Sequence, residues 1–177
     1  EFEGATSPVG RTLTAPEAYA SVDNLNLAIA SCANWESGFF AAYGDMAQRA
    51  RAGEIDHVVF LGDYIYEYPT GEYAGKSGVA RMHHPEWEIT TLEDYRQRHG
   101  RYRTDLNLQA AHAACPWIVV WDDHETANNS WLNGAENHTD GRVEGEWPER
   151  LSAAKQAYFE WLPVRAQSAG EEQLLYR

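Results

Sequence analysis

Residues 57–68 read HVVFLGDYIYEY, a short apolar run that ends at a glycine followed by an aspartate. A continuous apolar run of this length is expected of a parallel strand that is covered on both faces. Gly62 lets the chain turn as it leaves the strand, so Asp63 comes at the carboxyl end and Tyr66 follows three residues later. The segment therefore predicts a buried strand with a carboxylate and a phenol at its rim.

Two more apolar runs lead into polar side chains in the same manner. Residues 25–31, LNLAIAS, precede Cys32, and residues 117–121, WIVVW, lead into Asp123 and His124. In an open α/β sheet the ligand site lies beyond the carboxyl ends of the strands, where residues far apart in sequence meet. We therefore expect these side chains to converge with Asp63 on one rim.

Helices are expected between and after the strands because apolar residues recur there at steps of three and four. The expected helices cover residues 38–51, 91–106 and 149–161. Thr91 is the predicted N-cap of the second helix, with Asp94 three residues on, and Gly100 is predicted to divide that helix in two. The order β-α-β-α-β-α predicts an α/β fold with a mostly parallel sheet and right-handed crossovers.

Two long segments, residues 68–88 and 128–147, are expected to be loops that wall the site. His83 and His84 lie in the first loop and are expected to be exposed to solvent rather than to contact phosphate. Four arginines of the following helix are expected to form one solvated face rather than a phosphate clamp. They are Arg96, Arg98, Arg101 and Arg103.

The charge excludes some partners. With 27 acidic and 14 basic residues the net charge is −13, whereas a nucleic-acid binder presents a basic face or stripe. We expect no nucleic-acid specificity, and the acidity either suits cations or only keeps the protein soluble. No hydrophobic stretch approaches the roughly 20 residues that span a bilayer, so no transmembrane segment is expected.

The chain has two cysteines, Cys32 and Cys115. They flank predicted parallel strands at opposite ends, a geometry that disfavours a disulfide because bridged Cα atoms must lie within about 7 Å. A thiolate binds ferric iron well, so Cys32 beside Asp63 and Tyr66 would make a mixed oxygen and sulfur site selective for iron. The alternative is a buried, inert thiol.

The remaining polar residues also fit a metal site. A tyrosine oxygen becomes a good ligand when a strongly acidic cation removes its proton, so Tyr66 after Asp63 favours a trivalent ion. Asp122 and Asp123 are adjacent carboxylates that a nearby cation would compensate, and alternation along the strand lets one of them ligate. His124 could protonate a leaving oxygen or hold a developing oxyanion. The alternatives are a turn carboxylate with a core aromatic residue, and a helix-capping pair with a satisfied histidine.

The blocks SCANWESGFF, VVFLGDYIYEY, WDDHETANN and YFEWLPVR resemble, in order and spacing, the PhoD-type alkaline phosphatases and phosphodiesterases. That family is a branch of the calcineurin-like metallophosphoesterases and includes a secreted bacterial phospholipase D. The resemblance implies an α/β/β/α sandwich, of which this chain supplies the N-terminal β-α-β-α-β-α half. It also implies a secreted or extracytoplasmic bacterial protein.

The same resemblance implies a domain division. Residues 1–20 would be a leader at the end of an immunoglobulin-like module, and residues 21–177 the N-terminal half of the catalytic domain. The last residues, EEQLLYR, are similar to the start of a new strand. A C-terminal segment of the same protein, either a separate chain or missing, would complete the domain.

The resemblance also implies roles for individual residues. Cys32 and Tyr66 would ligate ferric iron, Asp63 would bridge iron and calcium, and Asp123 would lie on the second metal's side. His124 would be catalytic, and Asn128 would join the calcium shell or touch the phosphate.

The implied reaction is hydrolysis of a phosphoric ester. A metal-bound hydroxide or oxide would attack phosphorus in line while His124 assists the departing oxygen. The substrate would be a phosphate ester or, as an alternative, a phospholipid cleaved by phospholipase D activity. A second alternative is a calcium-binding module without catalysis, which would use acidic loops but would need neither His124 nor Tyr66.

Overall fold

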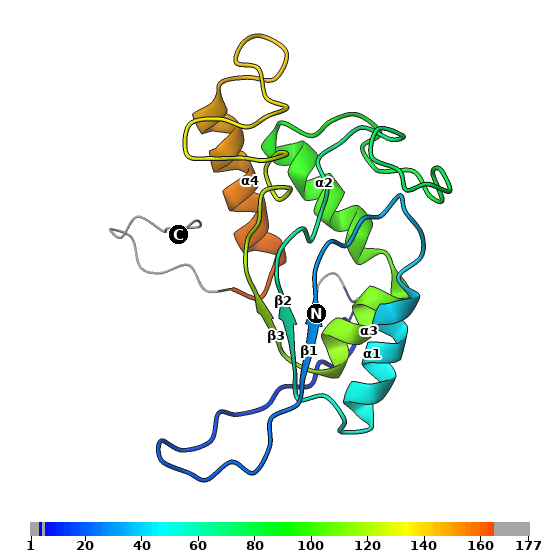
Figure 1. Cartoon of the computed structure of the whole chain (residues 1–177), viewed down its shortest axis with the longest axis vertical. Helices are drawn as coiled ribbons and strands as arrows, with labels where there is room; N and C mark the ends of the chain where they lie inside the picture. The colour runs from blue at the N-terminus through cyan, green and yellow to red at the C-terminus, as the bar shows by residue number, and fades with distance from the viewer. Residues whose placement is uncertain (1–3, 5, 165–177) are drawn as a thin grey trace.

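The computed structural model describes residues 4 and 6–164 of the chain. The strand expected at residues 171–177 lies outside this part. Figure 1 shows the elements of the described part. In chain order they are β1 (Leu27–Ala30), α1 (Ala41–Arg51), β2 (His57–Phe60), α2 (Leu92–Arg103), α3 (Leu106–Ala114), β3 (Trp117–Val119) and α4 (Trp147–Trp161). No helix among them combines the length and the apolar character needed to cross a membrane.

The three strands form one parallel sheet in the order β1-β2-β3. The register pairs Leu27 with His57 and Val58 with Trp117. The predicted α/β fold with a parallel sheet is therefore confirmed, and the carboxyl ends of all three strands lie at the same edge (Figure 1). Both predicted loops are also found, since residues 68–88 and 128–146 contain no helix and no named strand.

The prediction that Gly100 divides a helix is wrong. Thr91 caps α2 with a capping box to Asp94, as predicted, and α2 continues through Gly100 to Arg103. The break comes at Asp105, whose side chain accepts hydrogen bonds from the backbone N–H groups of Asn107 and Leu108 and so starts α3. A strong N-cap, rather than the weak helix propensity of glycine, sets this boundary.

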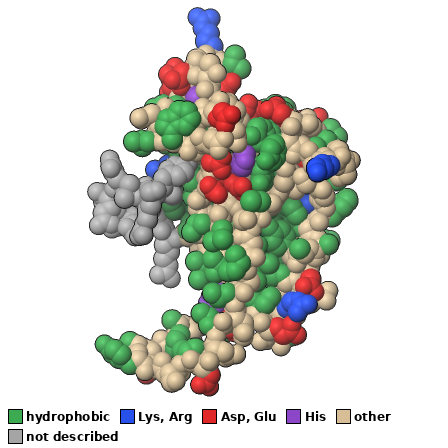
Figure 2. Space-filling model, in the orientation of Figure 1, with side chains coloured by type: hydrophobic (Ala, Val, Ile, Leu, Met, Phe, Trp, Pro, Cys, Tyr) green, Lys and Arg blue, Asp and Glu red, His purple; other side chains and the backbone are tan. Residues whose placement is uncertain are grey.

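The two faces of the sheet differ. The face toward α1 and α3 is buried, with the Trp117 ring stacked on Phe60 at 5.7 Å and lying 6.1 Å from Tyr43 of α1. The opposite face leaves apolar side chains exposed, and Figure 2 shows hydrophobic side chains gathered over the strands. We call this surface the open sheet face; it consists of Leu27, Ile29, Leu61, Ile118 and Val120. In a four-layer sandwich a second sheet packs on such a face.

The prediction of a solvated arginine face is wrong because Arg98 is completely buried. Its guanidinium donates to the backbone oxygens of Tyr66, Tyr68, Pro85 and Trp87. These four carbonyls belong to the segment after β2 and to the far end of the first loop. Arg98 therefore ties both ends of that loop to α2.

His83 is also buried, contrary to the prediction, whereas His84 is exposed as predicted. The His83 ring stacks on Tyr102 at 6.3 Å, and its Nε2 lies 3.7 Å from Glu36 Oε2. Burial lowers the pKa of His83 to about 3, with Arg98 and Arg101 acting in the same direction. His83 is therefore a neutral packing residue.

The buried side chain of His99 is expected to make the stability of the fold depend on pH. It is completely buried between Tyr64 and Trp161, and burial lowers its pKa to about 3. Below pH of about 6.5 only the unfolded state binds a proton at this histidine, so the free energy of unfolding falls by roughly 1.4 kcal/mol per pH unit down to the folded-state pKa. His99→Phe is expected to remove this pH-dependent loss of stability. The free energy of unfolding of His99→Phe minus that of the parent should therefore rise by about 2 kcal/mol from pH 7 to pH 5.

Urea unfolding at the two pH values measures this difference. His84→Phe, at the exposed histidine, controls for the loss of a histidine as such. An equal pH dependence in the parent and in His99→Phe would contradict the prediction.

Candidate metal centre

The ends of β1 and β2 bring Cys32 and Asp63 side by side. Cys32 N donates to Gly62 O at 3.1 Å and Ala33 N donates to Asp63 O at 2.8 Å, so the pairing continues past both strands. Cys32 and Asp63 have φ values of 58° and 57°, a left-handed conformation that is uncommon outside glycine. At Gly62, with φ of 99°, a Cβ atom would collide with Asp122. Glycine is therefore required here.

Asp63 lies at the centre of the group. Cys32 Sγ and Tyr66 Oη donate to Asp63 Oδ2 at 3.3 Å and 3.2 Å. Asp63 Oδ1 is buried and has no hydrogen-bond partner among the described residues. Because an unpaired buried carboxylate oxygen is costly, this atom fits a ligand to a cation.

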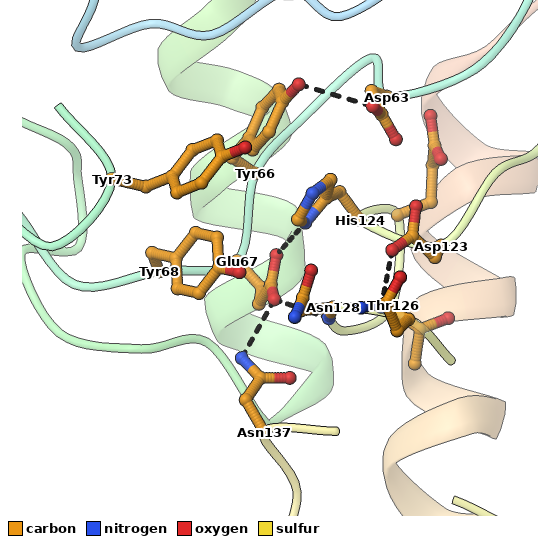
Figure 3. A network of polar contacts seen from close by, with 12 residues as sticks. Asp63, Tyr66, Glu67, Tyr68, Tyr73, Asp123, His124, Thr126, Asn128 and Asn137 are labelled. Atoms are coloured by element: carbon orange, nitrogen blue, oxygen red, sulfur yellow. Dashed lines mark hydrogen bonds and ion pairs between the residues drawn. The ribbon is translucent and has the colours of Figure 1, made fainter. Parts of the chain in front are cut away.

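Asp123 and His124, which follow β3, complete the group. Asp63, Asp123 and His124 each offer one ligand atom, and these atoms lie within 4.8 Å of one another. Figure 3 shows His124 in the middle, with Asp63 and Asp123 on one side and tyrosine rings on the other. Asp122 is exposed and its Oδ1 accepts from the backbone N–H of Asp123 at 3.0 Å. The chain thus brings only the second of the two adjacent carboxylates to the group.

The electrostatics of the group also fit a cation. Burial raises the pKa values of Cys32, Asp63 and Tyr66, and the charge of Asp63 raises those of its two neighbours further. The charge of Asp63 therefore opposes the ionisation of Cys32 and Tyr66. A cation at Asp63 would reverse this effect, because it favours the ionised form of each ligand.

Glu67 is a residue that the sequence analysis missed. It is completely buried, and its Oε2 lies 2.8 Å from His124 Nδ1. Its Oε1 accepts from Asn128 N at 2.6 Å and from Asn137 Nδ2 at 2.9 Å (Figure 3). Burial alone would lower the pKa of His124, but the hydrogen bond and charge of Glu67 raise it above its usual value. A carboxylate four residues after Asp63 was the signal available in the sequence.

Glu125 was also missed. It is completely buried and accepts from Tyr64 N at 2.6 Å and from Asp122 N at 2.9 Å. Burial raises its pKa to about 8. Because Tyr64 follows Asp63 and Asp122 precedes Asp123, this one carboxyl group holds the ends of β2 and β3 together.

Asn128 lies at the edge of the group. Its backbone N–H donates to Glu67, and its side-chain Nδ2 donates to Glu136 Oε2 at 3.2 Å. Asp123 Oδ2, in turn, accepts from the backbone N–H of Asn129. The structure therefore brings together Cys32, Asp63, Tyr66, Asp123 and His124, with Asn128 behind His124 across the Glu67 carboxylate.

Comparison with known proteins identifies the family. A model described as PhoD-like phosphatase matches residues 27–177. The chain belongs to the PhoD-like phosphatase family. It is 46% identical over 173 residues to alkaline phosphatase D of Bacillus subtilis (strain 168). A solved structure of PhoD aligns with a TM-score of 0.82 at 45% identity over 97% of this chain. The predicted resemblance and fold class are confirmed.

The matches cover almost all of this chain but a minor part of each PhoD relative. The chain spans 28% of the length of the Bacillus protein and 32% of the chain in the solved structure.

Proposed function

We propose that the full-length protein is a metal-dependent phosphoric ester hydrolase whose centre includes Cys32, Asp63, Tyr66 and Asp123. The observation that carries this proposal is the convergence of these residues at the ends of three strands, with Asp63 Oδ1 buried and unpaired among residues 4 and 6–164. Membership of the PhoD-like phosphatase family supports the reaction class.

The donor chemistry supports the choice of metals. The thiol of Cys32 and the phenol of Tyr66 favour a strongly acidic cation, for which we propose ferric iron. Asp123 offers a hard oxygen that suits calcium, with Asp63 between the two ions. Asn128 is proposed for the calcium shell or for contact with phosphate. Its Nδ2 is engaged by Glu136, which leaves its amide oxygen as the candidate ligand atom.

His124 is proposed to donate a proton to the departing oxygen. The bound cations would neutralise the phosphate oxygens and supply an acidified water as the nucleophile. Glu67 accepts the Nδ1–H of His124, so Nε2 is the atom left for proton transfer. The charge of Glu67 also favours the protonated ring, which is the form that can act as an acid.

A calcium-binding module without catalysis is less consistent with the structure. Such a site needs oxygen ligands, whereas here a buried carboxylate orients a histidine beside the group. Monoester, diester and phospholipid hydrolysis would share these residues. Assays with one substrate of each kind therefore distinguish these activities, phospholipase D activity included.

The proposal extends to the domain organisation and the location of the protein. Residues 1–20 are proposed to end an immunoglobulin-like module and residues 21–177 to be the first half of the catalytic domain. A C-terminal segment of the same protein, on this chain or a separate one, would supply the remaining ligands. The open sheet face supports a covering segment. Secretion from a bacterial cell is proposed from the resemblance to a family with secreted members.

Two measurements on the full-length protein test this proposal: its metal content and its hydrolysis of three substrates. We expect bound iron with a visible charge-transfer colour, bound calcium, and hydrolysis of p-nitrophenyl phosphate, its bis ester or phosphatidylcholine. Removal of the metals with a chelator is expected to lower turnover at least about 100-fold, and iron with calcium should restore it. Calcium without iron, and no hydrolysis of any ester, would instead support the binding module.

A further inference from the structure

Three tyrosine rings form a wall beside His124. Tyr73 stacks on Tyr68 at 4.9 Å and on Tyr66 at 5.5 Å, with interplanar angles of 23° and 20°. The His124 ring lies 4.3 Å from Tyr66, 5.5 Å from Tyr68 and 5.8 Å from Tyr73. Figure 3 shows the three rings grouped on the side of His124 away from Asp123.

The rings differ in exposure. Tyr66 and Tyr68 are 4% and 7% exposed, whereas Tyr73 keeps 49% of its surface in solvent. The Tyr66 hydroxyl donates to Asp63, so it is already engaged within the proposed metal centre. Tyr73 is thus the outermost, accessible member of the wall.

The position of Tyr73 is fixed by its own loop. Tyr73 O accepts from Asn34 Nδ2 at 3.0 Å, and Gly71 N donates to Glu36 Oε1 at 2.7 Å. A Cβ atom at Gly75 would lie only 3.3 Å from Ser37 Oγ, so the loop lies tight against residues 34–37. The segment that follows Cys32 therefore holds the ring, and a ligand would not have to order it.

We propose that Tyr73 is a specificity-determining residue that stacks on a flat aromatic ring carried by the ester. This inference rests on the proposed function, because it takes phosphorus to bind at the group of Asp63, Asp123 and His124. The Tyr73 ring lies 5.5 Å from Tyr66, which contacts Asp63, and 5.8 Å from His124, so we expect a ring joined to phosphorus through one ester oxygen to lie beside it. The near-parallel rings favour an aromatic occupant, since a flat ring continues the stacked column and aromatic pairs gain free energy beyond the area that they bury.

Phosphonates test the inference without turnover. The full-length, metal-loaded protein should bind benzylphosphonate, in which a methylene group replaces the ester oxygen, roughly tenfold more tightly than methylphosphonate in calorimetry. In Tyr73→Ala the ratio of the two affinities should fall to about one, and in Tyr73→Phe the preference should persist. Tyr19→Ala removes an exposed tyrosine of the N-terminal segment and should leave the ratio at the parent value.

The outcomes separate the two proposals. If methylphosphonate binds but Tyr73→Ala keeps the preference for benzylphosphonate, the role of Tyr73 is wrong and the proposed function stands. If neither phosphonate binds, the phosphate-binding site itself is wrong and both proposals fail. A larger gain for a trimethylammonium-substituted ethylphosphonate than for benzylphosphonate would overturn the aromatic choice in favour of a cation on the tyrosine face.

Discussion

Asp63→Asn in the full-length protein is expected to abolish metal binding and turnover together. Asp63 contacts both Cys32 and Tyr66, and its second oxygen is buried without a partner in the described part of the chain. Loss of a residue that only supports a ligand costs roughly 10–100-fold in metal affinity or activity, so loss of this carboxylate should exceed 100-fold. Elemental analysis and ester hydrolysis measure the two losses.

The fold should survive this substitution. Asparagine tolerates the left-handed backbone at position 63, and burial already disfavours the charge of Asp63 when no cation is bound. Asp122→Asn is the matched control, because Asp122 is exposed and its side chain accepts a hydrogen bond from the neighbouring backbone N–H of Asp123. The assignment of Asp63 would be refuted if Asp63→Asn kept full metal content, or if the control lost it equally.

Arg98→Met is expected to lower the free energy of unfolding by about 3–5 kcal/mol. The buried guanidinium donates to four backbone oxygens, and methionine would leave all of them unpaired in the interior. Burial lowers the pKa of Arg98 to about 10, so the group is still charged at neutral pH. Urea unfolding measures the loss. Metal binding should weaken as well, because Tyr66 is one of the four anchored residues.

Arg96→Met provides the control on the same helix. Arg96 forms a partly exposed ion pair with Glu160 at 2.6 Å, and such surface pairs contribute little. We therefore expect a change far smaller than that of Arg98→Met. Equal effects of the two substitutions would show that the buried position of Arg98 has no special importance.

Local signals in the sequence predicted the parts of the fold that depend on neighbouring residues. The apolar run before Gly62 gave β2, and Thr91 with Asp94 gave the capped start of α2. The parallel topology was then expected, because strands that alternate with helices favour a parallel sheet, and the sheet brings Cys32, Asp63 and Asp123 to one edge.

Contacts between distant segments were not predictable in this way. Glu67 meets His124 across 57 positions, and Glu125 meets Tyr64 across 61. Arg98 looked like a member of a solvated cluster because its four partners are backbone carbonyls, which no side-chain pattern reveals. The buried polar residues around the group were therefore not predicted, whereas the convergence of the side chains at the strand ends was.

The left-handed backbone at Cys32 and Asp63 has a consequence for protein engineering. A residue such as cysteine in this conformation costs about 1 kcal/mol or more, and aspartate less, so glycine is a substitution that stability-guided design would favour, above all at position 32. Accepting it would remove a thiol or a carboxylate from the proposed metal centre. Thermal robustness and the proposed chemistry thus compete at these positions, and a screen for heat tolerance alone would favour variants that lack these side chains.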